Sequence, residues 1–164
     1  SVAMLLREHF PVLDTWNVHI IATDLSRDVL NKARIGTYSQ LEVNRGLPES
    51  MLVRYFDKDG LSWQIRKPIR NMVDFRELNL NGHWRGVSGC DIILMRNVLI
   101  YFDIETKKQI LHNVRKNLAP NGFFMLGSSE STMKLDDSFT RVAAAKTSCY
   151  QTLAVGNGNS TSSF

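Results

Sequence analysis

The chain has 164 residues, 43% of them hydrophobic, which is enough apolar material for the core of one domain of ordinary size. Lys and Arg number 20 against 16 Asp and Glu, and the resulting net charge of +4 is too mild to indicate a nucleic-acid-binding protein. No run of about 18–20 apolar residues is present, so we expect no membrane insertion. The two cysteines and four scattered histidines show neither a disulfide framework nor metal-ligand spacing, which predicts a reduced, cytoplasmic domain without a metal site.

The first third of the chain predicts a helix, a buried strand and a second helix. Apolar residues at helical spacing run over 2–10 and stop at Pro11, and residues 17–24 (NVHIIATD) form a short β-branched run typical of a buried strand. Ser26 then stands at the N-cap position of the next helix, and Gly36 supplies its C-terminal stop. A strand followed by a helix is half of a βαβ unit, so the pattern predicts the α/β class.

The middle of the chain predicts a small β insertion between larger α/β elements. Residues 48–56 (PESMLVRYF) favour a short helix with Pro near its start. Asp59-Gly60 is a hairpin signal, and Leu61, Trp63 and Ile65 follow it in strand alternation. We expect the insertion to occupy about residues 40–72.

Strands and helices are again predicted to alternate in the last part of the chain. A strand, a helix and another strand are expected in that order, followed by a weaker edge strand and a polar tail that we expect to be disordered. These segments are the strand 90–95 (CDIILM), a helix capped by Asp103, a turn at 120–122, the strand 123–126 (FFML), the edge strand 148–153 and the tail 156–164.

Asp24 stands directly after the strand that ends IIAT. Ligands of open α/β sheets bind beyond the carboxyl ends of the strands, and a carboxylate there can accept hydrogen bonds from two ribose hydroxyls. The alternative is that Asp24 only caps the following helix, a task for which Ser26 is better placed.

A second candidate is the pair Asn79-Leu80, which follows the run Met72-Val73-Asp74-Phe75 by a few residues. An Asn side chain and an adjacent backbone N–H can read the amino and ring-nitrogen edge of adenine. Taken alone, Asn-Leu-Asn-Gly is more typical of a simple turn.

Arg96-Asn97 is a strongly polar pair at the end of the 90–95 strand, set between two apolar runs. Such residues are costly unless they point into a wet cleft or are hydrogen-bonded. The alternative to a cleft function is that Arg96 pairs with Asp91 or Asp103 while the Asn97 side chain satisfies the loop backbone.

Five segments of the chain form one recognisable pattern: RNVLIYFD (96–103), IIATDLS (20–26), LNKARIGTY (30–38), LAPNGFFMLG (118–127) and SSES (128–131). In this order and spacing they resemble the CheR family, the chemotaxis-receptor methyltransferases that use S-adenosylmethionine. The resemblance covers about residues 1–153, with Met95 where the family often has Cys and Ser128 where it often has His.

The resemblance implies a Rossmann-like class I methyltransferase sheet in which 40–72 is the family's β-subdomain. It also implies five cofactor-binding positions and two catalytic ones, with Arg96 in both groups. These are Asp24 for the ribose, Asn79 and Leu80 for the adenine, Arg96 and Asn97 along the cofactor cleft, and Tyr101, with Arg96, near the methyl-transfer centre.

The function implied is methylation of glutamate side chains on the cytoplasmic region of methyl-accepting chemotaxis receptors, as part of sensory adaptation. The products are γ-glutamyl methyl esters and S-adenosylhomocysteine. The resemblance implies no nucleic-acid partner. Two alternatives stay open: a non-catalytic CheR-like module or fragment, and a methyltransferase with another acceptor. The sequence predicts no oligomeric state.

The resemblance also implies that part of the domain lies upstream of Ser1. The chain opens in a helical pattern without an initiator Met, and the family's first, central strand and its Gly-containing cofactor loop precede that helix. We therefore expect residues 1–155 to be a partial methyltransferase domain that lacks this strand and loop and, on its own, binds cofactor poorly.

Overall fold

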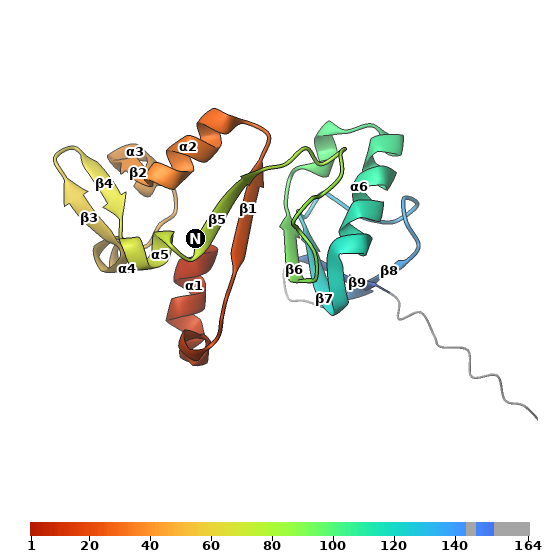
Figure 1. The fold of residues 1–164 in the computed structure, drawn as a ribbon, viewed down its shortest axis with the longest axis horizontal. Coiled ribbons are helices and arrows are strands. Elements are labelled where there is room, and N and C mark those ends of the chain that lie inside the picture. Colours follow the sequence, from red (N-terminus) through yellow and green to blue (C-terminus); the bar gives the residue numbers. More distant parts are fainter. Residues whose placement is uncertain (144–146, 153–164) are drawn as a thin grey trace, which may run out of the picture. The chain divides into compact units, whose positions relative to one another are not determined.

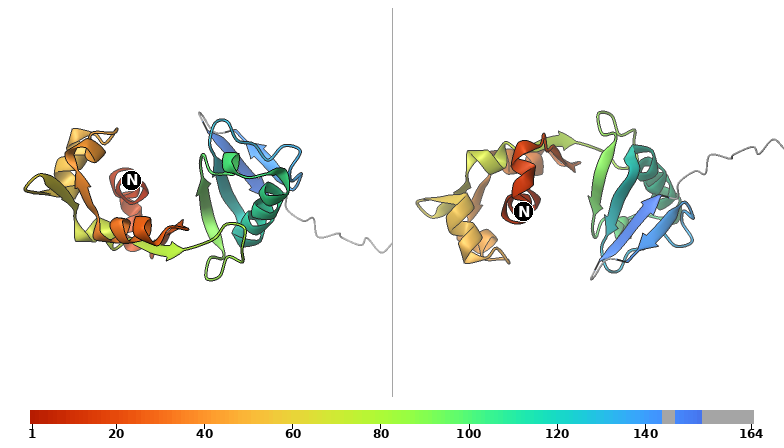
Figure 2. Two further views of the ribbon diagram at one scale, coloured as in Figure 1. Left: turned by 90° about the horizontal axis from the view of Figure 1, so that it is seen from above. Right: turned by 90° about the horizontal axis from the view of Figure 1, so that it is seen from below.

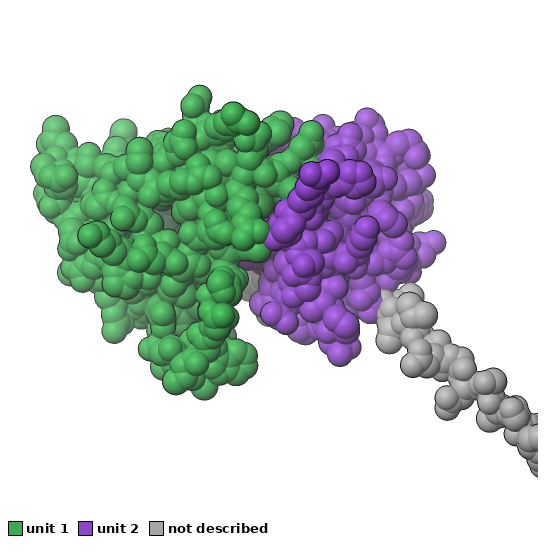
Figure 3. All heavy atoms as spheres, in the orientation of Figure 1, with its two compact units in different colours: residues 1–79 green, residues 80–164 purple. Residues whose placement is uncertain are grey.

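The computed structural model describes residues 1–143 and 147–152 and divides into two compact units, residues 1–79 (unit 1) and 80–164 (unit 2) (Figure 3). Each unit combines helices with a pair of parallel strands, which confirms the predicted α/β class. Among the described residues, no helix is both long and apolar enough to span a bilayer. The predicted tail 156–164 lies outside the described residues.

Unit 1 contains a parallel strand pair and a small antiparallel sheet (Figure 1). β1 and β5 run parallel, and the antiparallel sheet has the order β2-β4-β3, with the β3–β4 hairpin at the end of the unit away from β1 (Figures 1 and 2). The elements are α1 (Val2–His9), the 3-10 helix η1 (Pro11–Thr15), β1 (Ile20–Asp24), α2 (Arg27–Ile35), β2 (Thr37–Ser39), α3 (Gln40–Val43), α4 (Glu49–Tyr55), β3 (Phe56–Asp59), β4 (Ser62–Ile65), α5 (Lys67–Arg70) and β5 (Val73–Glu77).

The residues expected to start and end the helices of unit 1 do so in the structure. α1 ends just before Pro11, which lacks the N–H that a longer helix would need. The Ser26 hydroxyl accepts a hydrogen bond from the N–H of Val29 at the start of α2, and Gly36 ends that helix in the left-handed conformation with φ 71°. The expected hairpin is present, but Leu61 lies in its turn and is 95% exposed, because β4 begins one residue later than the alternation suggested.

The core of unit 1 joins α1 to the antiparallel sheet. α1 buries Ala3 and Met4 in a cluster that also contains Leu52 and Tyr55 from α4. Glu8 of α1 adds a polar link, since its carboxylate accepts a hydrogen bond of 2.5 Å from the Tyr55 hydroxyl. That hydrogen bond is the main reason why the pKa of Glu8 lies below its usual value.

Unit 2 is a four-stranded sheet of order β6-β7-β9-β8 with α6 packed on it (Figures 1 and 2). Its core contains three fully buried α6 side chains, Ile110, Leu111 and Val114, and two from β7, Phe124 and Leu126. The elements are β6 (Cys90–Met95), the 3-10 helix η2 (Leu99–Tyr101), α6 (Ile104–Asn117), β7 (Leu118–Leu126), β8 (Phe139–Val142) and β9 (Ser148–Thr152).

Two sequence-based predictions for unit 2 are wrong in detail. Residues 120–122 are not a turn before the strand but part of β7, where the register slips: Cys90 pairs with Leu118, and Ile92 with Phe123. β9 is not at the edge of the sheet, because the unpredicted β8 pairs with its outer side. β8 has only four residues and mixed polarity, so it leaves too little periodicity to be recognised.

The expected absence of a central strand stays a prediction. β1 has only β5 as a strand neighbour and β6 has only β7, so each has one edge without a strand partner within the described residues. The division into a partial domain over 1–155 and an insertion over 40–72 likewise stays a prediction.

The end of α2 depends on Gly36, and this dependence can be measured. A Cβ atom at Gly36 would lie 2.5 Å from Cγ2 of Ile65, and the positive φ is itself unfavourable for an L-residue. We expect Gly36→Ala to lower the free energy of unfolding by about 2–4 kcal/mol, about 1–2 from backbone strain and the rest from the clash. Urea denaturation followed by circular dichroism measures this loss.

Gly60→Ala is the matched control, because Gly60 also has a positive φ, of 56°, but a Cβ atom there would have no neighbour within 4 Å. This variant should therefore lose only the backbone part, about 1–2 kcal/mol. Equal losses in the two variants would show that the contact with Ile65 is unimportant.

Candidate functional site

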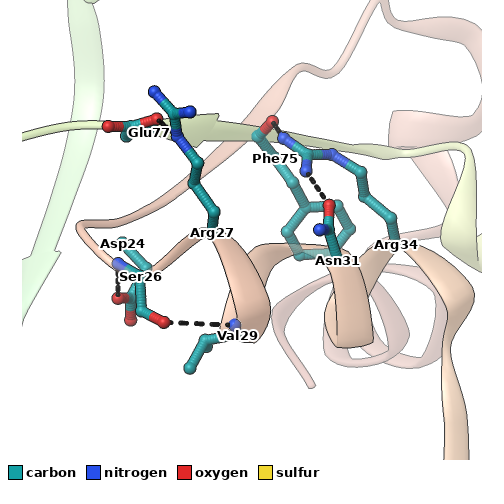
Figure 4. Close-up of polar contacts among 8 residues, drawn as sticks. All are labelled: Asp24, Ser26, Arg27, Val29, Asn31, Arg34, Phe75 and Glu77. Carbon is teal, nitrogen blue, oxygen red and sulfur yellow. Dashed lines mark hydrogen bonds and ion pairs between the residues drawn. The ribbon is translucent and has the colours of Figure 1, made fainter.

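Asp24 is the last residue of β1, and its side chain is exposed at the carboxyl end of that strand (Figure 4). Its Oδ1 accepts a hydrogen bond of 2.8 Å from the N–H of Ser26, while the Ser26 hydroxyl accepts one of 3.4 Å from the N–H of Val29. Ser26 is thus the helix cap, and Asp24 uses one oxygen to close the turn before it. No described residue bonds its other oxygen, which can accept a hydroxyl group of a ligand.

α2 is fastened to β5 by two arginines, which fixes the turn that carries Asp24 (Figure 4). Arg27 Nε donates to Glu77 Oε2 at 2.6 Å, and Arg34 Nη2 donates to the carbonyl oxygen of Phe75 at 2.6 Å. The partners of both bonds are more than forty residues apart in the sequence, so these are tertiary contacts that hold α2 against β5.

Asn79 lies near Asp24 in the strand register. Asp24 pairs with Glu77, the last residue of β5, and Asn79 follows two residues later with an exposed side chain. The N–H of Leu78 donates to the Asp24 carbonyl at 3.0 Å. The carboxyl ends of β1 and β5 thus bring two of the predicted cofactor-binding residues to one edge of unit 1.

Leu80 belongs to unit 2 and is held by its carbonyl group. That oxygen accepts hydrogen bonds from Trp84 Nε1 at 3.1 Å and from Asn113 Nδ2 at 3.3 Å. Asn113, a buried residue of α6, also donates to the Gly82 carbonyl at 3.0 Å. The loop after Leu80 is therefore fixed to α6, which sets the direction of the Leu80 backbone.

Arg96 follows β6 directly and is exposed. Its side chain makes no hydrogen bond or ion pair with any described residue, so the alternative in which it pairs with Asp91 or Asp103 is wrong. Asp103 instead caps α6, accepting a hydrogen bond of 2.8 Å from the N–H of Thr106. Arg96 therefore presents a guanidinium group that a ligand carboxylate can bind.

Glu130 is the residue of this region that sequence reasoning missed. Its carboxylate is buried, with 6% of the residue exposed, and accepts four backbone hydrogen bonds. Oε1 binds the N–H groups of Val98 (2.8 Å) and Leu99 (2.7 Å), and Oε2 those of Asn97 (2.7 Å) and Gly127 (2.8 Å). The sequence-based alternative was that the Asn97 side chain satisfies the backbone of this loop. In the structure, the Glu130 carboxylate binds these backbone N–H groups instead.

The ionised form of Glu130 is favoured by these donors. Burial raises the pKa of its carboxyl group, but the four N–H donors together lower it more, so the net pKa lies below its usual value. Glu130 is therefore an anion at neutral pH. The sequence feature that could have pointed to Glu130 was an acidic residue in a short polar segment, GSSE, directly after a buried strand.

Tyr101 ends η2, just after the backbone that Glu130 binds. Its side chain is 80% exposed, whereas Leu99 two residues earlier is 2% exposed and packs in the core of unit 2. The N–H of Tyr101 donates to the Val98 carbonyl at 3.3 Å. The exposed phenol of Tyr101 thus extends from a backbone segment that is held by hydrogen bonds to Glu130 and by the buried side chain of Leu99.

The predicted site residues therefore fall in two groups, Asp24 and Asn79 in unit 1 and Leu80, Arg96, Asn97 and Tyr101 in unit 2. The described residues contain no group of three or more His, Cys, Asp and Glu that could hold a metal ion.

Residues 1–148 match the family described as CheR methyltransferase, SAM binding domain. The chain belongs to this family. The sequence-based resemblance is thereby confirmed, and the family's description gives S-adenosylmethionine (SAM) as the ligand of this domain.

Two relatives show how much of a CheR protein the chain represents. It is 41% identical over 126 residues to chemotaxis protein methyltransferase 1 of Pseudomonas aeruginosa, covering 76% of this chain and 46% of the relative. It is 39% identical over 133 residues to chemotaxis protein methyltransferase Cher2 of Pseudomonas putida, covering 80% and 48%. The chain spans about half the length of the curated relatives it matches.

Among solved structures, the glycopeptide N-methyltransferase MtfA complexed with SAM is 15% identical to the chain, with a TM-score of 0.45 over 92% of this chain and 56% of that one. This likeness is too distant to support an inference about the CheR chain.

Because Asn113 holds the loop after Leu80, its removal should destabilise the protein. Asn113→Ala removes the donor for two carbonyl groups, and we expect the free energy of unfolding to fall by about 1–3 kcal/mol. The emission maximum of the protein's tryptophan fluorescence should also move to longer wavelength, because Trp84 shares the Leu80 carbonyl and becomes more accessible to water.

Lys108→Ala is the control on the same helix, since the one polar contact of its side chain within the described residues is an exposed ion pair with Glu105. It should change the unfolding free energy by less than about 1 kcal/mol and leave the fluorescence unchanged. An Asn113→Ala variant as stable as the wild type would contradict the anchoring role.

Proposed function

We propose that this chain is the cofactor-binding part of an enzyme that methylates glutamate side chains of chemotaxis receptors, using SAM as methyl donor. The observation that carries the proposal is the match to the CheR family over residues 1–148. The two relatives described above are both named chemotaxis protein methyltransferases, which supports chemoreceptors as the substrates. The proposed partner is the cytoplasmic region of such a receptor, and the proposed location is the cytoplasm.

The residues at the strand ends fit the chemical groups of SAM. The exposed Asp24 carboxylate has acceptor capacity for ribose hydroxyls beyond its bond to Ser26. The Asn79 side chain and the backbone N–H of Leu80 suit the amino and ring-nitrogen edge of adenine. The Arg96 guanidinium suits the carboxylate of the methionine part. When bound, the cofactor supplies a methyl group activated by a positively charged sulfur.

The acceptor requires little from the protein besides position. A glutamate side chain has an ordinary pKa near 4.3 and is already a carboxylate at neutral pH, so no general base is needed. Alignment of the reacting groups, with water excluded, can supply up to about 7–11 kcal/mol of the barrier reduction. We assign this orienting task to Arg96, through its charge, and to Tyr101, through its hydroxyl group.

The cofactor site is tested by Asp24→Asn in the intact gene product. The amide oxygen can still close the turn with Ser26, but the charged acceptor for the ribose is lost. We expect the dissociation constant for SAM, measured by isothermal titration calorimetry, to rise about 10- to 150-fold, which corresponds to about 1.5–3 kcal/mol.

Asp28→Asn is the matched control, because it removes the same charge from an exposed position in the first turn of α2. It should leave SAM affinity within about twofold of the wild type. Wild-type affinity in Asp24→Asn would remove Asp24 from the site, and a wild-type protein that does not bind SAM would favour the non-catalytic module.

The catalytic assignment is tested by Tyr101→Phe. No described residue bonds the exposed Tyr101 hydroxyl, so the substitution should leave stability unchanged. If the hydroxyl orients the acceptor, kcat/KM for receptor methylation should fall by about 10-fold or more, corresponding to about 1.4 kcal/mol or more. Steady-state transfer of a labelled methyl group measures the change.

Tyr38→Phe serves as the comparison in unit 1, because no described residue bonds that hydroxyl group either. Its kcat/KM should equal that of the wild type. An unchanged kcat/KM in Tyr101→Phe would exclude Tyr101 from the mechanism.

A further inference from the structure

We infer that Glu130 is the positioning residue of this site: its buried carboxylate fixes the backbone of residues 96–99, here called the 96–99 loop, and so aims Arg96 and Tyr101 for methyl transfer. This inference rests on the proposed function. It adds a role for a residue that touches neither cofactor nor acceptor in the proposal.

The backbone of the 96–99 loop is shaped as an anion-binding nest. Asn97 has a positive φ of 57°, and Val98 follows with φ −119° and ψ −45°. This alternation turns successive N–H groups to one side, where they can share one anion. Three consecutive N–H groups, those of Asn97, Val98 and Leu99, bind the Glu130 carboxylate at 2.7–2.8 Å. The chain therefore supplies its own anion to the nest.

Glu130 also ties the 96–99 loop to the end of the neighbouring strand. Gly127 directly follows β7, and its N–H donates to the same Oε2 that binds Asn97. The two strand ends are in close contact, because a Cβ atom on Gly127 would lie 2.7 Å from that Oε2 and would also collide with Asn97 Oδ1. The loop cannot move away from β7 without breaking these bonds.

The side chains that the proposal uses stand on either side of this anchor. Arg96 directly precedes the nest, and Tyr101 follows it as the last residue of η2. Neither side chain is held by its own hydrogen bonds within the described residues, so the anchored backbone is what sets their direction. A misplacement of about 1 Å can cost an enzyme about 100-fold in rate, and loss of the carboxylate would permit such a shift.

The test compares Glu130→Gln with the wild-type intact protein at a temperature where both are folded. The amide offers one acceptor oxygen in place of two and points an NH2 group at N–H donors, so the nest opens. We expect kcat for receptor methylation to fall about 10- to 100-fold. The KM for SAM should rise by a smaller factor, because Arg96 is misdirected while Asp24, Asn79 and Leu80, which the variant does not touch, still hold the cofactor. Hydrogen exchange should show faster exchange of the amides of 97–99.

Two further variants keep the test decisive. Glu130→Asp retains the charge on a shorter arm and should restore part of the lost kcat, which a merely space-filling role would not predict. Gly127→Ala keeps the Glu130 side chain in the protein, but its Cβ atom would lie 2.7 Å from Oε2 of the carboxylate and 2.4 Å from Asn97 Oδ1. It should therefore displace the carboxylate from the nest and lower kcat even if Glu130→Gln does not fold.

Ser131→Ala is the matched control in the same segment, because among the described residues the Ser131 hydroxyl accepts a hydrogen bond from the N–H of Met133 and from no member of the nest. Its kcat and exchange rates should equal those of the wild type. Wild-type kcat in a folded Glu130→Gln or Gly127→Ala variant would overturn the positioning role and leave the proposed function intact. A wild-type protein without methyl-transfer activity would overturn both.

Discussion

The organisation of unit 2 depends on one carboxylate that satisfies the backbone where two parallel strands end. N–H groups that leave a sheet lose their ladder partners, and a buried unpaired N–H costs about 1–3 kcal/mol. Glu130 binds four such groups, three after β6 and one after β7. Each bond to a charged acceptor contributes about 1.5–3 kcal/mol. Burial raises the pKa of Glu130, and the four N–H donors keep that pKa below its usual value.

Side chains also hold backbone groups in and after β5. Arg34 of α2 binds the Phe75 carbonyl in the middle of β5, and Asn113 of α6 binds the Leu80 carbonyl three residues after that strand. Two of the side chains proposed to meet the ligands keep polar groups available: Arg96 has no partner among the described residues, and Asp24 commits only one of its two oxygens to its turn. A rigid backbone with exposed polar side chains is the arrangement that positioning chemistry needs.

What the sequence could predict follows from how far apart the interacting groups lie along the chain. The caps at Ser26 and Asp103 bind N–H groups three residues ahead, so they were recognisable from local spacing. Asn97 and Glu130 are separated by 33 residues, and no local pattern reports such a bond. The order β7-β9-β8 likewise depends on tertiary pairing. The positions of the candidate residues came from the strand-end rule and the family resemblance; the groups that hold them came from the structure.

This distinction affects how substitutions at the site are interpreted. The Tyr101 hydroxyl is exposed and bonds no described residue, so its removal changes little besides chemistry, and a lower rate can be attributed to the reaction itself. Glu130 contributes to folding and to loop geometry through the same four bonds, so its effect on rate contains both. Only a change in kcat among molecules that remain folded, with cofactor binding preserved, separates geometry from stability, because unfolding removes cofactor binding and turnover together.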